Sequence, residues 1–176
     1  MLWHWRLGLG AYISFWPAGF GRFLVLVHTG RKSGRFYHTP VNYAEIGGDV
    51  YVAAGFGQVT DWYRNIMAQS RIEVWLPNGR WLMQAEDVTG SEGSTAIMRA
   101  VLKGSGFAAY LAGVNPNRLS DVELQAATAD YRLLRLCRVV PLAGPGGPGD
   151  KVWLLPLLVV AAVAVGMFFV GRRRHG

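Results

Sequence analysis

The chain has 176 residues, of which 51% are hydrophobic and 16% are charged, and its formal net charge is +7. This composition is too apolar for a disordered chain and poorer in charge than an average soluble domain, in which roughly 25% of residues are charged. Residues 151–176 contribute +4 of the net charge, and residues 1–150, which contain no run of like charges, contribute +3. Because the body of the chain is only mildly basic, we expect no nucleic-acid partner.

Residues 1–22 are rich in aromatic side chains and lack the basic region and clean apolar core of a cleavable signal peptide. We predict a helical segment here. It either packs on its own domain or lies in a membrane interface as an amphipathic helix, and the sequence leaves both possibilities open.

Residues 23–140 alternate between short apolar runs and turn residues, which predicts a domain that is mainly β with helical additions. The run at 23–29 lies between two glycines and is typical of a strand buried on both faces. Two hairpins follow, with turns at Gly47-Gly48-Asp49 and at Pro77-Asn78-Gly79-Arg80. Helices are expected at 61–68 and from 91 to about 103. The predicted strands are 23–29, 39–46, 50–54, 72–76, 81–88 and 132–140.

The C-terminal residues predict a linker followed by a membrane anchor. Residues 141–151 begin with a stretch of three Pro and four Gly, too many for a regular element. Residues 152–170 are uncharged and, as a helix, would cover about 28 Å, close to the roughly 30 Å hydrocarbon core of a bilayer. We therefore expect a single-pass transmembrane helix, a basic tail at 171–176, a lipid bilayer as partner, and a catalytic domain in the cytoplasm.

The chain offers no metal site and no internal disulfide. Cys137 is the single cysteine and lies in an apolar run, which favours a buried, inert thiol. The four histidines lack metal-ligand spacing, and we interpret His28 as a strand residue with local hydrogen-bond partners.

Two segments carry the candidate chemistry. The first, Thr29-Gly30-Arg31-Lys32-Ser33-Gly34-Arg35, is a tight loop after a buried strand, and it can bind an anion through backbone amides and cations or be a solvated basic turn. The second runs from Ala53 to Asn65, where a strand ends in a glycine-bracketed loop and enters a helix. Glycines there let a flat ligand approach the backbone, and Phe56 or Trp62 could cover its face, although core packing explains Trp62 equally well.

Together the motifs TGRKSG, Thr39-Pro40, VYVAAGFG and DWYRNI, in this order and spacing, closely resemble the deazaflavin-dependent nitroreductase and quinone reductase family. The resemblance covers roughly residues 23–88 and continues more weakly to 140. It implies a split β-barrel related to FMN-binding barrels, which uses the reduced deazaflavin coenzyme F-420 as hydride donor.

The resemblance also implies roles for individual residues. Arg31, Lys32 and Ser33, on the loop that ends at Gly34, would hold the coenzyme's phosphate and acidic tail. The remaining cofactor-binding candidates would border the deazaflavin ring or close its edge: Thr39, Pro40, Ala54, Gly55, Phe56, Asp61 and Trp62. Tyr110, on a segment that the resemblance places over the pocket, would be the candidate proton donor, or a lid or core aromatic.

This chain departs from the family pattern at two places. Many members have a basic residue where it has Tyr37, and a Ser-Lys-Gly-Gly loop where it has Gly55-Phe56-Gly57-Gln58. Fewer cations would then face the coenzyme, and His38 or Arg35 could compensate.

The function that the resemblance implies is hydride transfer from the reduced coenzyme to a quinone or nitroaromatic acceptor, and the predicted membrane helix favours a lipid-soluble, menaquinone-like one. Two alternatives stay open: an FMN-dependent oxidoreductase, and a non-catalytic membrane-anchored barrel that binds a cofactor.

Overall fold

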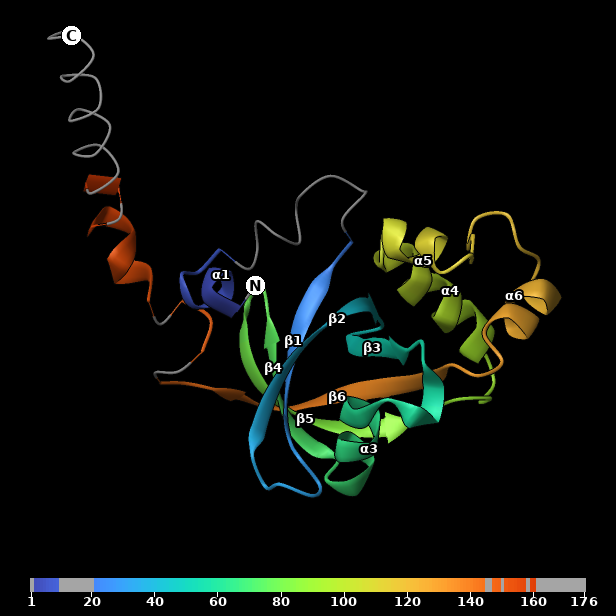
Figure 1. The fold of residues 1–176 in the computed structure, drawn as a ribbon, viewed down its shortest axis with the longest axis horizontal. Coiled ribbons are helices and arrows are strands. Elements are labelled where there is room, and N and C mark those ends of the chain that lie inside the picture. Colours follow the sequence, from blue (N-terminus) through green and yellow to red (C-terminus); the bar gives the residue numbers. More distant parts are fainter. Residues whose placement is uncertain (1, 10–20, 145–146, 150, 158, 161–176) are drawn as a thin grey trace, which may run out of the picture.

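Six antiparallel strands form a closed barrel in the computed structural model, which describes residues 2–9, 21–144, 147–149, 151–157 and 159–160 (Figure 1). The order around the barrel is β1-β2-β3-β6-β5-β4, and β4 pairs with β1 to close it. This confirms the prediction of a mainly β barrel with helices. The strands are β1 (Phe23–Thr29), β2 (Phe36–Ile46), β3 (Asp49–Ala54), β4 (Arg71–Leu76), β5 (Gly79–Asp87) and β6 (Arg132–Leu142).

Five α-helices and two short 3-10 turns accompany the strands in the described residues. The helices α4, α5 and α6 gather on one side of the barrel, and α1 lies beside β1 and β4 (Figure 1). The helices are α1 (Leu2–Arg6), α3 (Asp61–Ala68), α4 (Ser94–Gly104), α5 (Phe107–Leu111) and α6 (Asp121–Ala127), and the turns are η1 (Gly57–Val59) and η2 (Val152–Leu154).

Both predicted hairpins are present, with tighter turns than expected. Ile46 pairs with Asp49, so Gly47 and Gly48 alone make the β2–β3 turn, with φ of 61° and 90°. Two consecutive residues with positive φ fit the right-handed twist of the flanking strands, and glycine adopts them at least cost. Leu76 pairs with Gly79, so β5 begins two residues before its predicted start.

The barrel is filled from its strands and closed at one end by α3. Leu24, Leu26 and Leu134 are fully buried in the interior cluster, and Tyr63 and Ile66 of α3 belong to the same cluster. A second cluster lies outside the barrel, where Met98, Val101 and Leu102 of α4 and Leu124 of α6 pack on β3 and β6. The helix α3 is therefore held against the barrel end by its apolar face, which leaves its first turn at the rim.

The N-terminal helix α1 packs on its own domain, which decides between the two possibilities for the part of residues 1–22 that the structure describes. Trp5 is fully buried against Val25 of β1 and Trp75 of β4. Leu24 and Leu26 face the barrel interior, and Val25 packs on the other side against Trp5. The strand β1 is therefore buried on both faces, as predicted.

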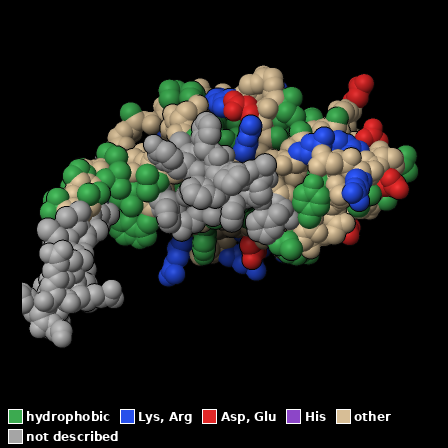
Figure 2. All heavy atoms as spheres, turned by 90° about the horizontal axis from the view of Figure 1, so that it is seen from above, with side chains coloured by type: hydrophobic (Ala, Val, Ile, Leu, Met, Phe, Trp, Pro, Cys, Tyr) green, Lys and Arg blue, Asp and Glu red, His purple; other side chains and the backbone are tan. Residues whose placement is uncertain are grey.

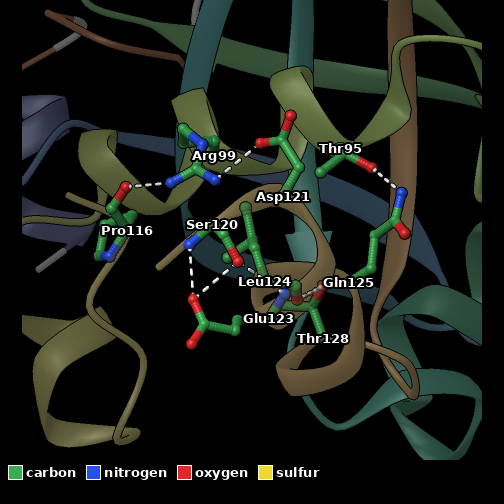
Figure 3. A network of polar contacts seen from close by, with 9 residues as sticks. All are labelled: Thr95, Arg99, Pro116, Ser120, Asp121, Glu123, Leu124, Gln125 and Thr128. Atoms are coloured by element: carbon green, nitrogen blue, oxygen red, sulfur yellow. Dashed lines mark hydrogen bonds and ion pairs between the residues drawn. The ribbon is translucent and has the colours of Figure 1, made fainter. Parts of the chain in front are cut away.

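A polar network joins α4 to α6 on the far side of the second cluster (Figure 3). Arg99 pairs with Asp121 at 2.8 Å and also donates to the carbonyl of Pro116. Ser120 and Glu123 form a reciprocal capping box at the start of α6. The remaining bonds run from Gln125 to Thr95 and from Thr128 to the carbonyl of Leu124.

The structure corrects the prediction of a transmembrane helix over 152–170. None of the helices in the described ranges has the length and apolar character needed to cross a bilayer. The described part of the predicted span opens with the 3-10 turn η2 and is helical at 155–157 and 159–160. Just before it, the N–H groups of Gly149 and Lys151 donate to the carbonyls of Trp5 and Arg6. Residue 158 and residues 161–176 lie outside the described residues. The single-pass membrane localisation depended on that helix and was wrong. The prediction of a bilayer partner had the same basis and has no support.

Hydrophobic side chains gather where the described part of the predicted span lies, at the left of the view from above (Figure 2). Val152, Trp153 and Leu157 are each more than half exposed.

Candidate functional site

A cleft of about 470 Å³ lies between the β1–β2 loop and the start of α3, within the usual size range of ligand pockets. The loop and the helix are held together because both are anchored on the same end of the barrel. The residues that line the cleft are His28, Gly30, Arg31, Lys32, Ser33, Tyr37, Thr39, Asp61, Trp62 and Asn65.

The β1–β2 loop has a fixed shape. The N–H of Gly30 donates to the carbonyl of Arg35, and the N–H of Gly34 donates to the carbonyl of Gly30, each at 2.8 Å. A Cβ at Gly30 would come within 2.5 Å of Ser33 Oγ and 2.6 Å of the Tyr37 ring, so a larger residue there would displace one of these side chains. This tight turn presents Lys32 and Ser33 at the mouth of the cleft.

Arg31 connects the loop to α3. Its guanidinium pairs with the Asp61 carboxylate at 2.9 Å and donates to Asn65 Oδ1 at 2.9 Å. The main-chain N–H of Arg31 donates to the same oxygen at 3.1 Å. Much of the donor capacity of Arg31 therefore holds the walls of the cleft together, whereas Lys32 has no ion pair within the described part of the chain.

Three polar side chains form the floor of the cleft. His28 Nε2 lies 3.0 Å from Thr39 Oγ1, and His28 Nδ1 lies 3.3 Å from Asn65 Nδ2. His28 and Asn65 are 3% and 6% exposed, and the Tyr37 ring stacks on His28 at 5.8 Å between centroids. His28 has local partners, as predicted.

Two histidines near the cleft are kept neutral. Burial lowers the pKa of His28, and the charge of His38 lowers it further. Burial also lowers the pKa of His38, with Glu73 opposing and Arg6 adding to the effect. The fixed positive charge at the cleft therefore comes from Arg31 and Lys32, partly offset by Asp61.

The cleft brings together six of the residues singled out from the sequence, namely Arg31, Lys32, Ser33, Thr39, Asp61 and Trp62. The other candidates lie elsewhere. Ala54 is buried in the barrel core, where it pairs with Arg132, and Pro40 pairs with Val25 in β2. Gly34 belongs to the loop without lining the cleft.

The loop after β3 carries Gly55 and Phe56. Gly55 packs near the ring of Tyr131, and the Phe56 side chain is 84% exposed. Gly57 has φ of 61°, and a Cβ there would lie 2.2 Å from the Asp130 carbonyl oxygen. Arg64 of α3 donates to the carbonyl of Gln58 at 2.7 Å, so a cation lies beside this loop although the loop itself has no lysine.

Tyr110 lies on α5 and does not line the cleft. Its side chain is about half exposed, and its hydroxyl accepts a hydrogen bond from Asn117 Nδ2 at 2.8 Å. Cys137, which the sequence favours as an inert thiol, is partly buried, and burial raises the pKa of its thiol.

Sequence reasoning did not single out Asn65, His28 and Tyr37 as residues of the site. A signal for Asn65 was its spacing of four residues from Asp61, which puts both on one face of a helix. A signal for Tyr37 was its spacing of two residues from Thr39, which puts both on one face of a strand.

The cleft at the rim of the β-barrel is lined by a tight glycine-containing loop, two cations and several hydroxyls, which is chemistry that suits an anionic ligand. The family described as F420H(2)-dependent quinone reductase matches residues 15–119. The chain belongs to this family, is therefore an oxidoreductase, and its cofactor is coenzyme F-420.

Several solved structures are similar to this chain, and the first of them supports the fold. A Bacteroides thetaiotaomicron protein named for resistance to 5-nitroimidazole antibiotics is 9% identical, with a TM-score of 0.50 over 74% of this chain and 80% of its own. The Agrobacterium tumefaciens protein Atu2129, of unknown function, is 24% identical, with a TM-score of 0.48 over 76% of this chain. This chain spans 55% of the Agrobacterium protein's length. An F420-H2 dependent reductase, FDR-A, is 18% identical, with a TM-score of 0.46 over 65% of this chain and 92% of its own. A comparison with curated proteins found no match.

Proposed function

We propose that the cleft between the β1–β2 loop and α3 holds the phosphate of coenzyme F-420 and that the enzyme reduces a quinone. The observation that supports this most directly is the grouping around one cleft of Lys32 and Ser33 from the β1–β2 loop and Thr39 from β2. An ammonium group and hydroxyls are donors that suit phosphate oxygens.

The residues present fit such a group. Lys32 supplies a charge that is not committed to an ion pair among the described side chains, and Asp61 is already neutralised by Arg31. Lys32 is exposed, so it can move to meet a ligand. Arg31 then acts mainly by fixing the loop, and Lys32 is the principal charge that contacts the phosphate.

When bound, the reduced deazaflavin supplies a hydride, so the protein needs no nucleophile of its own. The chain binds the phosphate through Lys32 and the hydroxyls and orients the bound group relative to the barrel. Trp62 packs partly against the interior cluster and fixes the start of α3 beside the cleft. Tyr110 remains a candidate proton donor, although it lies outside this cleft.

A quinone is the acceptor that the family description favours over a nitroaromatic compound. The finer form of the proposal is a menaquinone-like quinone. Family membership favours the deazaflavin enzyme over the FMN-dependent and non-catalytic alternatives.

The experiment is to titrate the purified chain with oxidised coenzyme F-420 and follow its fluorescence, and then to measure oxidation of the reduced coenzyme by a soluble menaquinone analogue and by a nitroaromatic compound. We expect micromolar binding and faster oxidation with the quinone. Binding without oxidation by the quinone would contradict the proposed acceptor, and a flavin spectrum in the purified protein would contradict the cofactor.

A further inference from the structure

A chain of hydrogen bonds runs from Arg31 through Asn65 and His28 to Thr39, and the chemistry of its members fixes the direction of each bond. The chain starts in the β1–β2 loop, crosses to α3, returns to β1 and ends on β2. Since Asn65 and His28 are both almost fully buried, water does not compete for these bonds.

The side-chain amide of Asn65 has a single consistent orientation. Its Oδ1 accepts both the main-chain N–H and the guanidinium of Arg31, at 3.1 and 2.9 Å. The nitrogen Nδ2 therefore faces His28 Nδ1, at 3.3 Å. An amide nitrogen only donates, so His28 Nδ1 must accept and carries no proton.

The orientation of Asn65 also determines the proton on the other ring nitrogen of His28. A neutral imidazole without a proton on Nδ1 carries one on Nε2, which lies 3.0 Å from Thr39 Oγ1. The Thr39 hydroxyl therefore accepts from His28. The hydrogen of the Thr39 hydroxyl has no acceptor among the described residues, and Thr39 lines the cleft.

We propose that Asn65 and His28 are positioning residues that leave the hydrogen of the Thr39 hydroxyl free to donate to an acceptor oxygen of the ligand in the cleft. The ligand class is an oxyanion or carbonyl oxygen, and its identity as coenzyme F-420 rests on the proposed function. A ligand that offers no acceptor at this point would leave the Thr39 hydrogen without a partner and bind less well.

Two further observations support this arrangement. The Tyr37 ring stacks on His28 with an interplanar angle of 17°, which holds the imidazole plane in place. Burial lowers the pKa of His28, which keeps the ring in the neutral form that the hydrogen bonds require.

The first test reads the protonation of the His28 ring nitrogens by nitrogen NMR of the full chain without ligand. We expect a proton on Nε2 and none on Nδ1. Asn65→Asp replaces the donor with an acceptor and should put a proton on Nδ1, while His38, which makes none of these hydrogen bonds, keeps its own tautomer and serves as the control. A proton on Nδ1 in the wild type would overturn the inference.

The second test compares Thr39→Ser, which keeps the hydroxyl, with Thr39→Val, which keeps the β-branched shape that suits β2. Binding of the oxidised coenzyme should stay within about twofold for the serine variant and weaken about tenfold for the valine variant, the loss typical of a hydrogen bond to a charged acceptor. Equal affinities of the two variants would overturn the inference. If the wild type does not bind the coenzyme, the proposed function fails, and the nitrogen spectrum decides the direction of the bonds by itself.

Discussion

Arg31 and Asn65 are joined by two hydrogen bonds to a single oxygen, one from the backbone of Arg31 and one from its guanidinium. Through this oxygen the β1–β2 loop is attached to α3, thirty-four positions along the chain. The β1–β2 loop and α3 form the two walls of the cleft, and these bonds hold the two walls together.

Asn65→Ala should lower the free energy of unfolding by about 1–3 kcal/mol, because it leaves the buried His28 and the Arg31 backbone without their partner. Urea unfolding measures this loss. Gln125→Ala, which removes one exposed bond from α6 to Thr95, is the control and should cost less than about 1 kcal/mol. Equal losses for the two variants would contradict the anchoring role of Asn65.

Lys32→Ala should weaken binding of the oxidised coenzyme about tenfold, because a charge-assisted hydrogen bond to a phosphate is lost. The matched control is Arg35→Ala, which removes one positive charge from the same loop at a position that does not line the cleft. We expect a change of about twofold or less for the control, since water and salt screen a more distant charge. If both variants lose affinity equally, net charge rather than contact explains the binding.

Tyr63 should make stability depend on pH in alkaline solution. Burial, together with the hydrogen bond and charge of Asp87, raises the pKa of Tyr63 to about 12. A phenol whose pKa is raised on folding stabilises the protein below its unfolded pKa of about 10, and this stabilisation is lost as the pH rises toward 12. Tyr63→Phe should remove that loss, as measured by urea unfolding between pH 8 and 12. If the free energies of unfolding of the wild type and the variant change with pH in the same way, Tyr63 is not the source of the pH dependence.

Tyr63→Phe should also change how the stability of the protein depends on pH in acid solution. Burial raises the pKa of Asp87, but hydrogen bonds from Thr89 and Tyr63, which donates at 2.5 Å, outweigh it, so the pKa lies below its ordinary value of 3.8. The carboxylate stabilises the fold above that value, and the stabilisation is lost as the pH falls below it. Tyr63→Phe should make the protein unfold at a higher pH during acid titration.

Trp5→Ala should cost about 3–5 kcal/mol, the usual loss for deleting a fully buried large aromatic side chain. Trp5→Phe keeps most of the volume, and Trp5 Nε1 has no hydrogen-bond partner among the residues that the structure describes, so this variant should cost clearly less. Thermal unfolding of both variants measures the difference. If Trp5→Ala unfolds like the wild type, α1 contributes nothing to the barrel.

Gly57→Ala and Gly47→Ala separate backbone strain from crowding, because both glycines have φ of 61°. A Cβ at Gly47 meets nothing within 4 Å, so only the left-handed backbone opposes it, at roughly 1–2 kcal/mol. The Cβ at Gly57 would also collide with the Asp130 carbonyl, and this variant should lose more stability. Equal losses of stability in the two variants would show that the loop after β3 moves to make room for the Cβ at position 57.

Local patterns were enough to predict the six strands and both hairpins, because paired glycines and the Pro-Asn turn act over two residues. They missed α6, although Ser120 and Glu123 have the spacing of a capping box. Local patterns could not predict that the barrel closes, since Val25 and Trp75 become neighbours only when the sheet curls.

The candidate site was predictable where one loop makes it and not where distant elements meet. Lys32 and Ser33 belong to a contiguous motif. The contact of His28 with Asn65 requires α3 to dock on the barrel end, and the start of β2 at Phe36, three residues before its predicted start, brings Tyr37 beside His28. Pairing across β1 and β2 at this point depends on tertiary packing, which overrides local propensity.

The position of β6 between β3 and β5 has a consequence for folding. Until Arg132–Leu142 has left the ribosome, the first five strands can form only an open sheet, with β3 and β5 as bare edges. Unpaired edges invite pairing with other chains, and closing a ring from pairs so distant in sequence slows folding. A nascent or truncated chain that ends before β6 is therefore the form of this protein most exposed to aggregation.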